Sequence, residues 1–156
     1  MTDLTFEKMS AMVGEPLGTS DWQTVTQEIV NEFANCTGDQ QWIHVDVERA
    51  KEESPFGGPV AHGYLTLSLL SAMAMEIGVV PKGTAAAVNY GLDKVRFLSP
   101  VSVGARVRLQ AKLIGFDRKK NGQYLMKTEN TMEIEGAKRP ALLAESLALL
   151  LPEADV

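Results

Sequence analysis

Cysteine, histidine and basic charge are all scarce in this chain of 156 residues. The single cysteine, Cys36, cannot form an internal disulfide, and the net charge of −5 argues against nucleic acid as the main partner. No apolar run reaches the length of a membrane span, and no basic segment followed by an apolar core opens the chain. The sequence therefore predicts a cytoplasmic protein that acts neither on nucleic acid nor in a membrane.

Signatures of common cofactors and metals are missing as well. The chain has no glycine-rich dinucleotide fingerprint, no P-loop and no paired cysteines for zinc. His44, Asp46 and His62 could supply metal ligands, but the set is sparse and lacks supporting residues, so we expect neither a metal nor a cofactor. The apolar content of 45% is ordinary for a globular protein, and the length favours one domain over residues 1–156.

The N-terminal half has helical periodicity interrupted by glycine and proline. We expect helices at residues 1–12, 26–36, 47–50 and 63–77, and a strand at residues 21–25. Thr24 or Thr26 can cap the second helix, Gly38 can end it, and Asp46 can cap the third. Asp39 to His44 are then a loop. The fourth helix is apolar on nearly every side, which predicts that it is buried on most sides.

The C-terminal half has the alternation of strands. We expect strands at residues 85–98, 106–113 and 124–135, with a hairpin turn at Asn121-Gly122. Residues 141–151 could be a helix or a buried strand, and the preceding hairpin favours a strand. One long helix against an antiparallel sheet predicts an α+β fold. Because one helix cannot cover both faces of such a sheet, we also expect a dimer.

Two unusual stretches contain both histidines of the chain. In the first, Asp39 and His44 lie five residues apart; in the second, His62 precedes Gly63 at the start of the apolar helix. A carboxylate and an imidazole close together can position a water molecule and move protons. A glycine amide at a helix start can hold a developing oxyanion. Adding water to an activated double bond requires these groups, although Asp39 alone could be a turn residue and His44 alone a hydrogen-bonding loop residue.

These stretches together resemble the MaoC-like dehydratases and the (R)-specific enoyl-CoA hydratases among them. The similar segments are residues 33–39 with His44 and Ala50, residues 56–57 and 61–63, and residues 89–92, 94–97 and 100–101. The last three segments look like the single-domain branch that includes nodulation protein N-like members. The resemblance implies a hot-dog fold, a curled antiparallel sheet around one long helix. It also implies a homodimer that binds acyl-CoA near its interface. Many members have Asn-Pro where this chain has Gln41-Trp42, a difference that affects the stiffness of the loop.

The resemblance implies reversible syn hydration of a trans-2-enoyl-CoA to an (R)-3-hydroxyacyl-CoA. Asp39 and His44 would be the acid/base pair, with the order of acid and base left open, and the N–H of Gly63 would hold the oxyanion. Ser71 and Asn89 are candidates for substrate contact. A serine bonded to its own helix and a satisfied strand-end amide are the alternatives for these two residues.

Other side chains have weaker functional interpretations. Those that could meet CoA phosphates, or else be solvated strand charges, are Lys94, Arg96, Arg106 and Arg108. Met73 and Met75 could border an acyl tunnel or fill the core. We expect His62 to bond its ring to backbone near the helix start, and Cys36 to be an inert, partly buried thiol.

Two other functions stay open at this stage. An acyl-CoA thioesterase of the same fold usually presents a carboxylate on the buried helix, and the only acid there is Glu76, near its far end. A non-catalytic acyl-thioester-binding protein would not need the combination of Asp39, His44 and Gly63.

Overall fold

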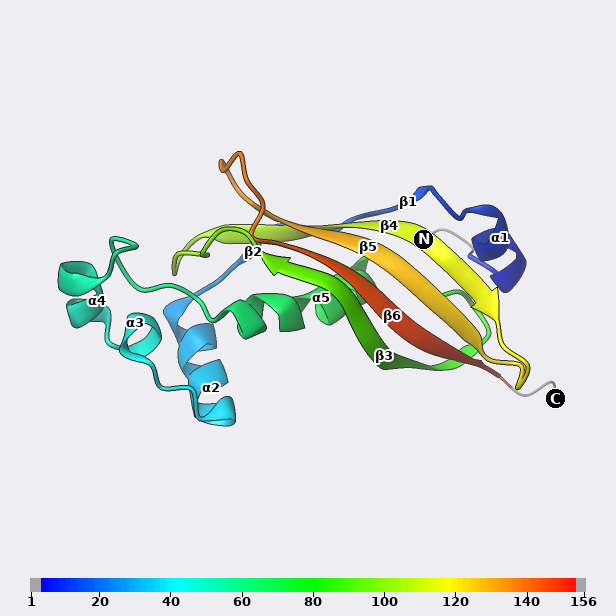
Figure 1. Cartoon of the computed structure of the whole chain (residues 1–156), viewed down its shortest axis with the longest axis horizontal. Helices are drawn as coiled ribbons and strands as arrows, with labels where there is room; N and C mark the ends of the chain where they lie inside the picture. The colour runs from blue at the N-terminus through cyan, green and yellow to red at the C-terminus, as the bar shows by residue number, and fades with distance from the viewer. Residues whose placement is uncertain (1–3, 154–156) are drawn as a thin grey trace.

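A computed structural model describes residues 4–153 and contains one sheet with helix α5 (Gly63–Ile77) lying along one face of it (Figure 1). The sheet has six strands that pair antiparallel in the order β1-β4-β5-β6-β3, and β2 also pairs with β4. The strands are β1 (Pro16–Thr19), β2 (Gln23–Thr24), β3 (Thr84–Phe97), β4 (Arg106–Arg118), β5 (Tyr124–Ile134) and β6 (Leu142–Pro152). This is the predicted α+β hot-dog arrangement, and the uncertain segment 141–151 is a strand.

The remaining helices lie at the two ends of the molecule. Helices α2 (Gln27–Thr37), α3 (Trp42–Val45) and α4 (Val47–Glu53) gather at the end where α5 begins, and α1 (Phe6–Ala11) lies at the other end (Figure 1). The expected helix at residues 1–12 is therefore shorter, and its first three residues lie outside the described residues. Within residues 4–153, no helix is both long and apolar enough to span a membrane.

The expected caps form because each depends only on neighbouring residues. The hydroxyl of Thr26 accepts a hydrogen bond from the amide of Ile29, and the carboxylate of Asp46 accepts one from the amide of Arg49. Gly38 ends α2 in the left-handed conformation, with φ of +83°. Together these caps determine where the chain leaves α2 and enters α4.

Two local predictions in this region are wrong. The strand expected at residues 21–25 is only the short β2, and the additional strand β1 has a bulge between Pro16 and Gly18. Neither proline nor glycine favours a strand interior, so β1 gives no strand signal in the sequence. His44 does not end a loop either, because it lies inside the single turn of α3.

The core lies between α5 and the inner face of the sheet. Leu65, Leu70 and Met73 are buried there against strand residues such as Leu109 and Met132. The opposite side of α5 is open to solvent. Tyr64 is 68% exposed and Met75 is 76% exposed. The prediction that α5 is buried on most sides is therefore wrong for a single chain. The sheet ends at β3, which is itself mostly exposed, so no further strand covers this side of the helix.

Candidate active site

The first of the two stretches, which contains Asp39 and His44, lies where α2 ends and α3 begins. After Gly38, the exposed carboxylate of Asp39 accepts a hydrogen bond of 3.4 Å from the amide of Gln41, which closes a turn. The side chain of Gln27 in α2 donates to the backbone carbonyl of His44 at 2.7 Å. Helix α3 is therefore tied to α2, and the ring of His44 is held inside the molecule at 7% exposure.

A hydrogen bond to the backbone of Val60, in the second stretch, orients the ring of His44. Its Nδ1 lies 2.6 Å from the carbonyl oxygen of Val60. Because a carbonyl oxygen only accepts, Nδ1 carries the hydrogen, and in the neutral ring Nε2 keeps a free lone pair. Burial lowers the pKa of His44 below its ordinary value of 6.5, against the Val60 hydrogen bond, which raises it. The charge of His62 lowers this pKa further, and that of Asp39 raises it. His44 is thus a neutral base at neutral pH.

His62, in the second stretch, contacts both Asp39 and His44 of the first stretch. Its ring is 2% exposed, and Nε2 lies 3.0 Å from the backbone carbonyl oxygen of Asp39. The ring also stacks on His44, with centroids 3.8 Å apart and an interplanar angle of 27°. The predicted hydrogen bond from the His62 ring to backbone is therefore present, but it is formed with the carbonyl of Asp39 and not with backbone at the start of α5. Within residues 4–153, the second ring nitrogen, Nδ1, is buried without a hydrogen-bond partner.

Gly63 follows His62 as the first residue of α5. The N–H groups of a first helical turn have no partner within the helix, and they lie at its positive end. A side chain at this position would be crowded, because a Cβ atom would lie 3.2 Å from the ring of Phe97. Glycine therefore keeps this helix start accessible beside the two histidines.

The same cluster has the residue types of a metal site, but its geometry does not suit one. The ligand atoms of Asp39, His44 and His62 all lie within 4.8 Å of one another. Each ring already has one nitrogen at a backbone carbonyl. The rings are stacked, so their remaining in-plane lone pairs lie in separate planes, whereas zinc requires both to point at one centre about 2.0–2.1 Å away. Asp46, which the sequence offered as a possible ligand, caps α4.

Ser71 and Asn89 lie in a different region, a cavity of about 640 Å³ between α5 and strands β3, β5 and β6. Met75 also lines this cavity, whereas Met73 is in the core. The cavity wall begins on α5 at Leu67, one turn after Gly63, and does not include Asp39 or His44. No side-chain hydrogen bond of Ser71 is found within residues 4–153, so the expected bond to its own helix is absent. Ser68 forms such a bond instead, to the carbonyl of Tyr64.

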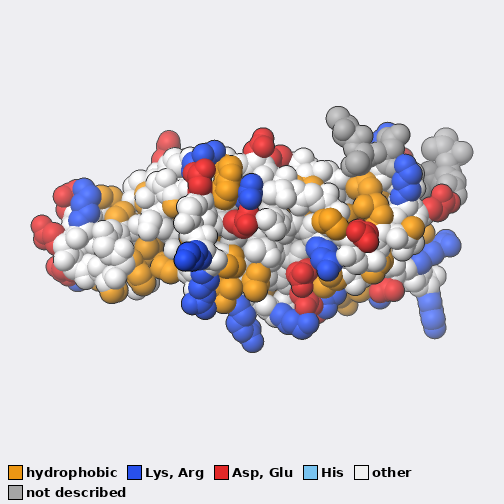
Figure 2. Space-filling model, turned by 90° about the horizontal axis from the view of Figure 1, so that it is seen from above, with side chains coloured by type: hydrophobic (Ala, Val, Ile, Leu, Met, Phe, Trp, Pro, Cys, Tyr) orange, Lys and Arg blue, Asp and Glu red, His pale blue; other side chains and the backbone are white. Residues whose placement is uncertain are grey.

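Most of the basic candidates for phosphate binding are paired with carboxylates. The pairs are Lys94 with Glu145, Arg106 with Glu135, and Arg108 with Glu133. Arg96 donates to the backbone carbonyl of Val95. Acidic, basic and apolar side chains are interspersed along the face shown in Figure 2. Three of the four candidates are therefore engaged within the sheet, and no broad basic patch marks this face.

Cys36 differs from its prediction. It lies in the last turn of α2 and is exposed rather than partly buried.

Comparison with known proteins gives one family and close relatives. The model of the MaoC like domain matches residues 8–135. The 3-hydroxyacyl-thioester dehydratase Z of Mycobacterium tuberculosis is 49% identical over 146 residues, which are 92% of this chain and 95% of that protein. Nodulation protein N of Rhizobium meliloti is 44% identical over 150 residues, which are 96% of this chain and 92% of that protein.

A solved structure supports the fold. The X-ray structure of the monoamine oxidase regulatory protein from Archaeoglobus fulgius superposes with a TM-score of 0.80 at 26% sequence identity. The match covers 97% of this chain and 96% of that chain.

Proposed function

This chain belongs to the MaoC-like dehydratase family, which contains hydro-lyases, and on that premise we propose that it reversibly hydrates a trans-2-enoyl thioester to an (R)-3-hydroxyacyl thioester. One observation carries the proposal. The carboxylate of Asp39 and the imidazole of His44 lie together beside the first residue of α5, where the N–H of Gly63 can donate a hydrogen bond to a developing oxyanion. We take CoA as the carrier of the acyl group.

In the hydration direction, Nε2 of His44 takes a proton from water while the water oxygen bonds to C3. The Val60 carbonyl accepts a hydrogen bond from Nδ1, so Nε2 is the ring nitrogen that can accept a proton. Asp39 accepts the other hydrogen of the same water and orients it. The pair returns one proton to C2 from the same face, so that OH and H add syn and the overall change is the addition of one water.

The thioester oxygen receives the electron density displaced from the double bond. The N–H of Gly63 at the positive end of α5 stabilises this oxyanion. A donor of this kind contributes about 10²–10³ in rate, and acid/base assistance contributes about 10²–10⁴.

A homodimer is part of the proposal. Strand β3 is an exposed edge along most of its length, and Val88, Tyr90 and Leu92 are among its exposed apolar side chains. Tyr64 and Met75 lie exposed on the neighbouring side of α5. Unpaired strand edges and contiguous apolar surface favour association, so a second copy of the chain would cover both elements. The exposed lone thiol of Cys36 fits a reducing, cytoplasmic setting.

The deciding experiment incubates the purified chain with crotonyl-CoA and follows the loss of enoyl-thioester absorbance. We expect hydration and a product of (R) configuration in chiral analysis. Release of free thiol without hydration would instead identify a thioesterase. Tight binding of acyl-CoA without turnover at any chain length would identify a binding protein.

A further inference from the structure

The cavity beside α5 is apolar over most of its wall. Leu67, Leu70 and Ala74 line it from the helix, and Met126 and Ala148 line it from the sheet. Its volume of about 640 Å³ falls within the roughly 300–1,000 Å³ of sites that enclose small ligands. An apolar space of this size along the middle and the end of α5 suits an acyl chain.

Three neighbouring polar side chains of β5 and β6 form a cluster in the sheet side of this wall. The amide nitrogen of Asn130 donates to the hydroxyl oxygens of Thr128 and Ser146, both at 3.0 Å. Because both hydroxyl oxygens accept from Asn130, the hydrogens of these two hydroxyls remain to be donated. Neither hydroxyl has an acceptor among residues 4–153. Thr128 is only 6% exposed and Asn130 only 3%, so the cluster is built into the wall rather than solvated at a surface.

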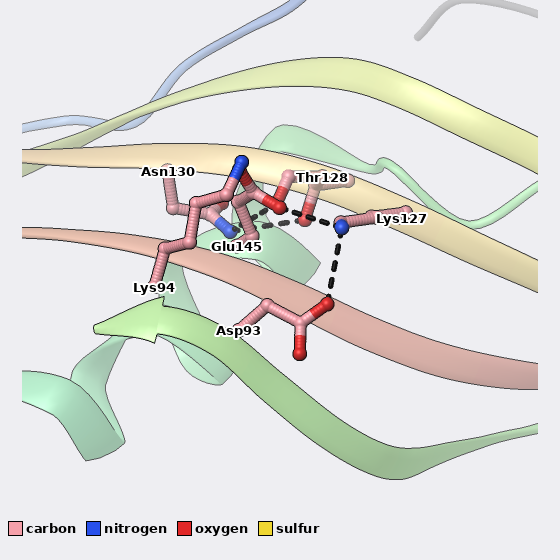
Figure 3. A network of polar contacts seen from close by, with 6 residues as sticks. All are labelled: Asp93, Lys94, Lys127, Thr128, Asn130 and Glu145. Carbon is pink, nitrogen blue, oxygen red and sulfur yellow. Dashed lines mark hydrogen bonds and ion pairs between the residues drawn. The ribbon is translucent and has the colours of Figure 1, made fainter.

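The strand register sets the distance between the two hydroxyls. Thr128 of β5 lies directly opposite Ser146 of β6. Their sequence neighbours Lys127 and Glu145 point to the other side of the sheet, because side chains alternate along a strand. There Lys127 pairs with Glu145 at 2.6 Å and with Asp93 of β3 at 3.0 Å, as Figure 3 shows. Ion pairs across three strands thus support the register in which the hydroxyls face the same space.

We propose that this cavity takes the acyl chain of the thioester and that Thr128 and Ser146 select a chain carrying an oxygen substituent, either a hydroxyl or a keto group, beyond the reacting double bond. The inference rests on the proposed hydratase function. Helix α5 leads from Gly63 at the oxyanion site to Leu67 at the cavity wall, four residues and roughly 6 Å along the helix axis. A chain whose thioester oxygen is held at Gly63 therefore runs along α5 into the cavity.

The selection follows from the two available donors. A ligand oxygen can accept hydrogen bonds from both hydroxyls and replace the water that otherwise satisfies them. A plain hydrocarbon chain displaces that water and leaves two buried donors unpaired, which is unfavourable. The cavity therefore discriminates between chains of equal length that differ only in oxygen content.

The test compares trans-2-enoyl-CoA thioesters of matched length, with and without a hydroxyl or keto group at successive positions of the chain. For the wild type we expect kcat/KM to be about tenfold or more higher for the oxygenated chain at one position, as one good hydrogen bond provides. Thr128→Val and Ser146→Ala should each remove this preference, which is the ratio of the kcat/KM values of one variant for the two chains and does not depend on its overall rate. Thr131→Val, in the same strand but outside this cavity, should keep the preference.

Each outcome decides a different point. Equal kcat/KM for both chains in a wild type that hydrates crotonyl-CoA would overturn the inference and leave the hydratase function standing. An oxygen preference that survives in both Thr128→Val and Ser146→Ala would also overturn it. A wild type that hydrates no enoyl-CoA would remove the proposed function and the inference together.

Discussion

Substitution of Asp39 by asparagine should separate catalysis from stability in this protein. The carboxylate of Asp39 is exposed, and its hydrogen bond within the described chain is the long one of 3.4 Å from the amide of Gln41. An asparagine side-chain oxygen can accept the same bond. We therefore expect the free energy of unfolding to change by no more than about 0.5 kcal/mol, as for most surface substitutions.

The effect of Asp39→Asn on the reaction should be much larger. If Asp39 and His44 act on one water molecule, loss of the carboxylate should lower kcat/KM by about 10²–10⁴. That factor corresponds to about 2.7–5.5 kcal/mol of transition-state stabilisation. The double variant with His44→Gln should be hardly slower than the single variants, because residues that act as a unit are not additive.

The pH dependence of kcat/KM gives a second test of Asp39→Asn, because the direction of its change is predicted. The charge of Asp39 raises the pKa of His44. Its removal should lower that pKa further, so any remaining activity should persist to a lower pH than in the wild type. The measurement is kcat/KM for crotonyl-CoA hydration between acid and neutral pH, with the melting temperature recorded for each variant.

Asp46→Asn provides the matched control. Asp46 is an exposed carboxylate close by in the same segment, and it caps α4, a role that asparagine fills equally well. It should keep wild-type kinetics and melting temperature. The catalytic assignment would be wrong if Asp39→Asn retained turnover near that of the wild type, or if Asp46→Asn lost as much.

Three further perturbations test other parts of the structure. His62→Phe should move the acid limb of the kcat/KM profile to higher pH, since it removes the imidazole whose charge lowers the pKa of His44; an unmoved limb would contradict this. Gly18→Ala should lower the melting temperature, because φ is +146° and the new Cβ would lie 2.8 Å from Cγ2 of Ile77. A cost of about 1–3 kcal/mol is equivalent to roughly 2–12 °C at this chain length, whereas Gly58→Ala, in open space, should be neutral. Tyr90→Lys at the edge of the sheet should shift sedimentation toward a monomer, and an unchanged sedimentation coefficient would place the interface elsewhere.

The features that sequence predicted best depend on neighbouring residues. Thr26, Gly38 and Asp46 cap or end helices through bonds to amides or carbonyls within a few positions, and such chemistry is readable locally. The alternation of β4 and β5 is equally local. Strand β1 escaped prediction because Pro16 and Gly18 give no strand signal, and only pairing with β4 makes the segment extended.

The candidate site shows where local information ends. Asp39, His44 and Gly63 could be proposed from spacing and resemblance, and their catalytic roles stay predictions. The contacts that orient them could not be proposed, because the Val60 carbonyl and the His62 ring reach their partners across 16 and 23 residues of chain. The exposure of α5 was also hidden, since an apolar helix looks the same in a sequence whether its own chain or a second copy covers it.

The link from His62 to the Asp39 carbonyl has a practical consequence for comparing and recombining relatives. Residues 37–46 and 56–63 touch through that link and through the stacked rings, so they form one cassette although 9 residues separate them in the chain. A chimera that exchanges only one of the two segments would pair an imidazole from one parent with a peptide from the other. Transplanting both segments together keeps the contacts between them intact.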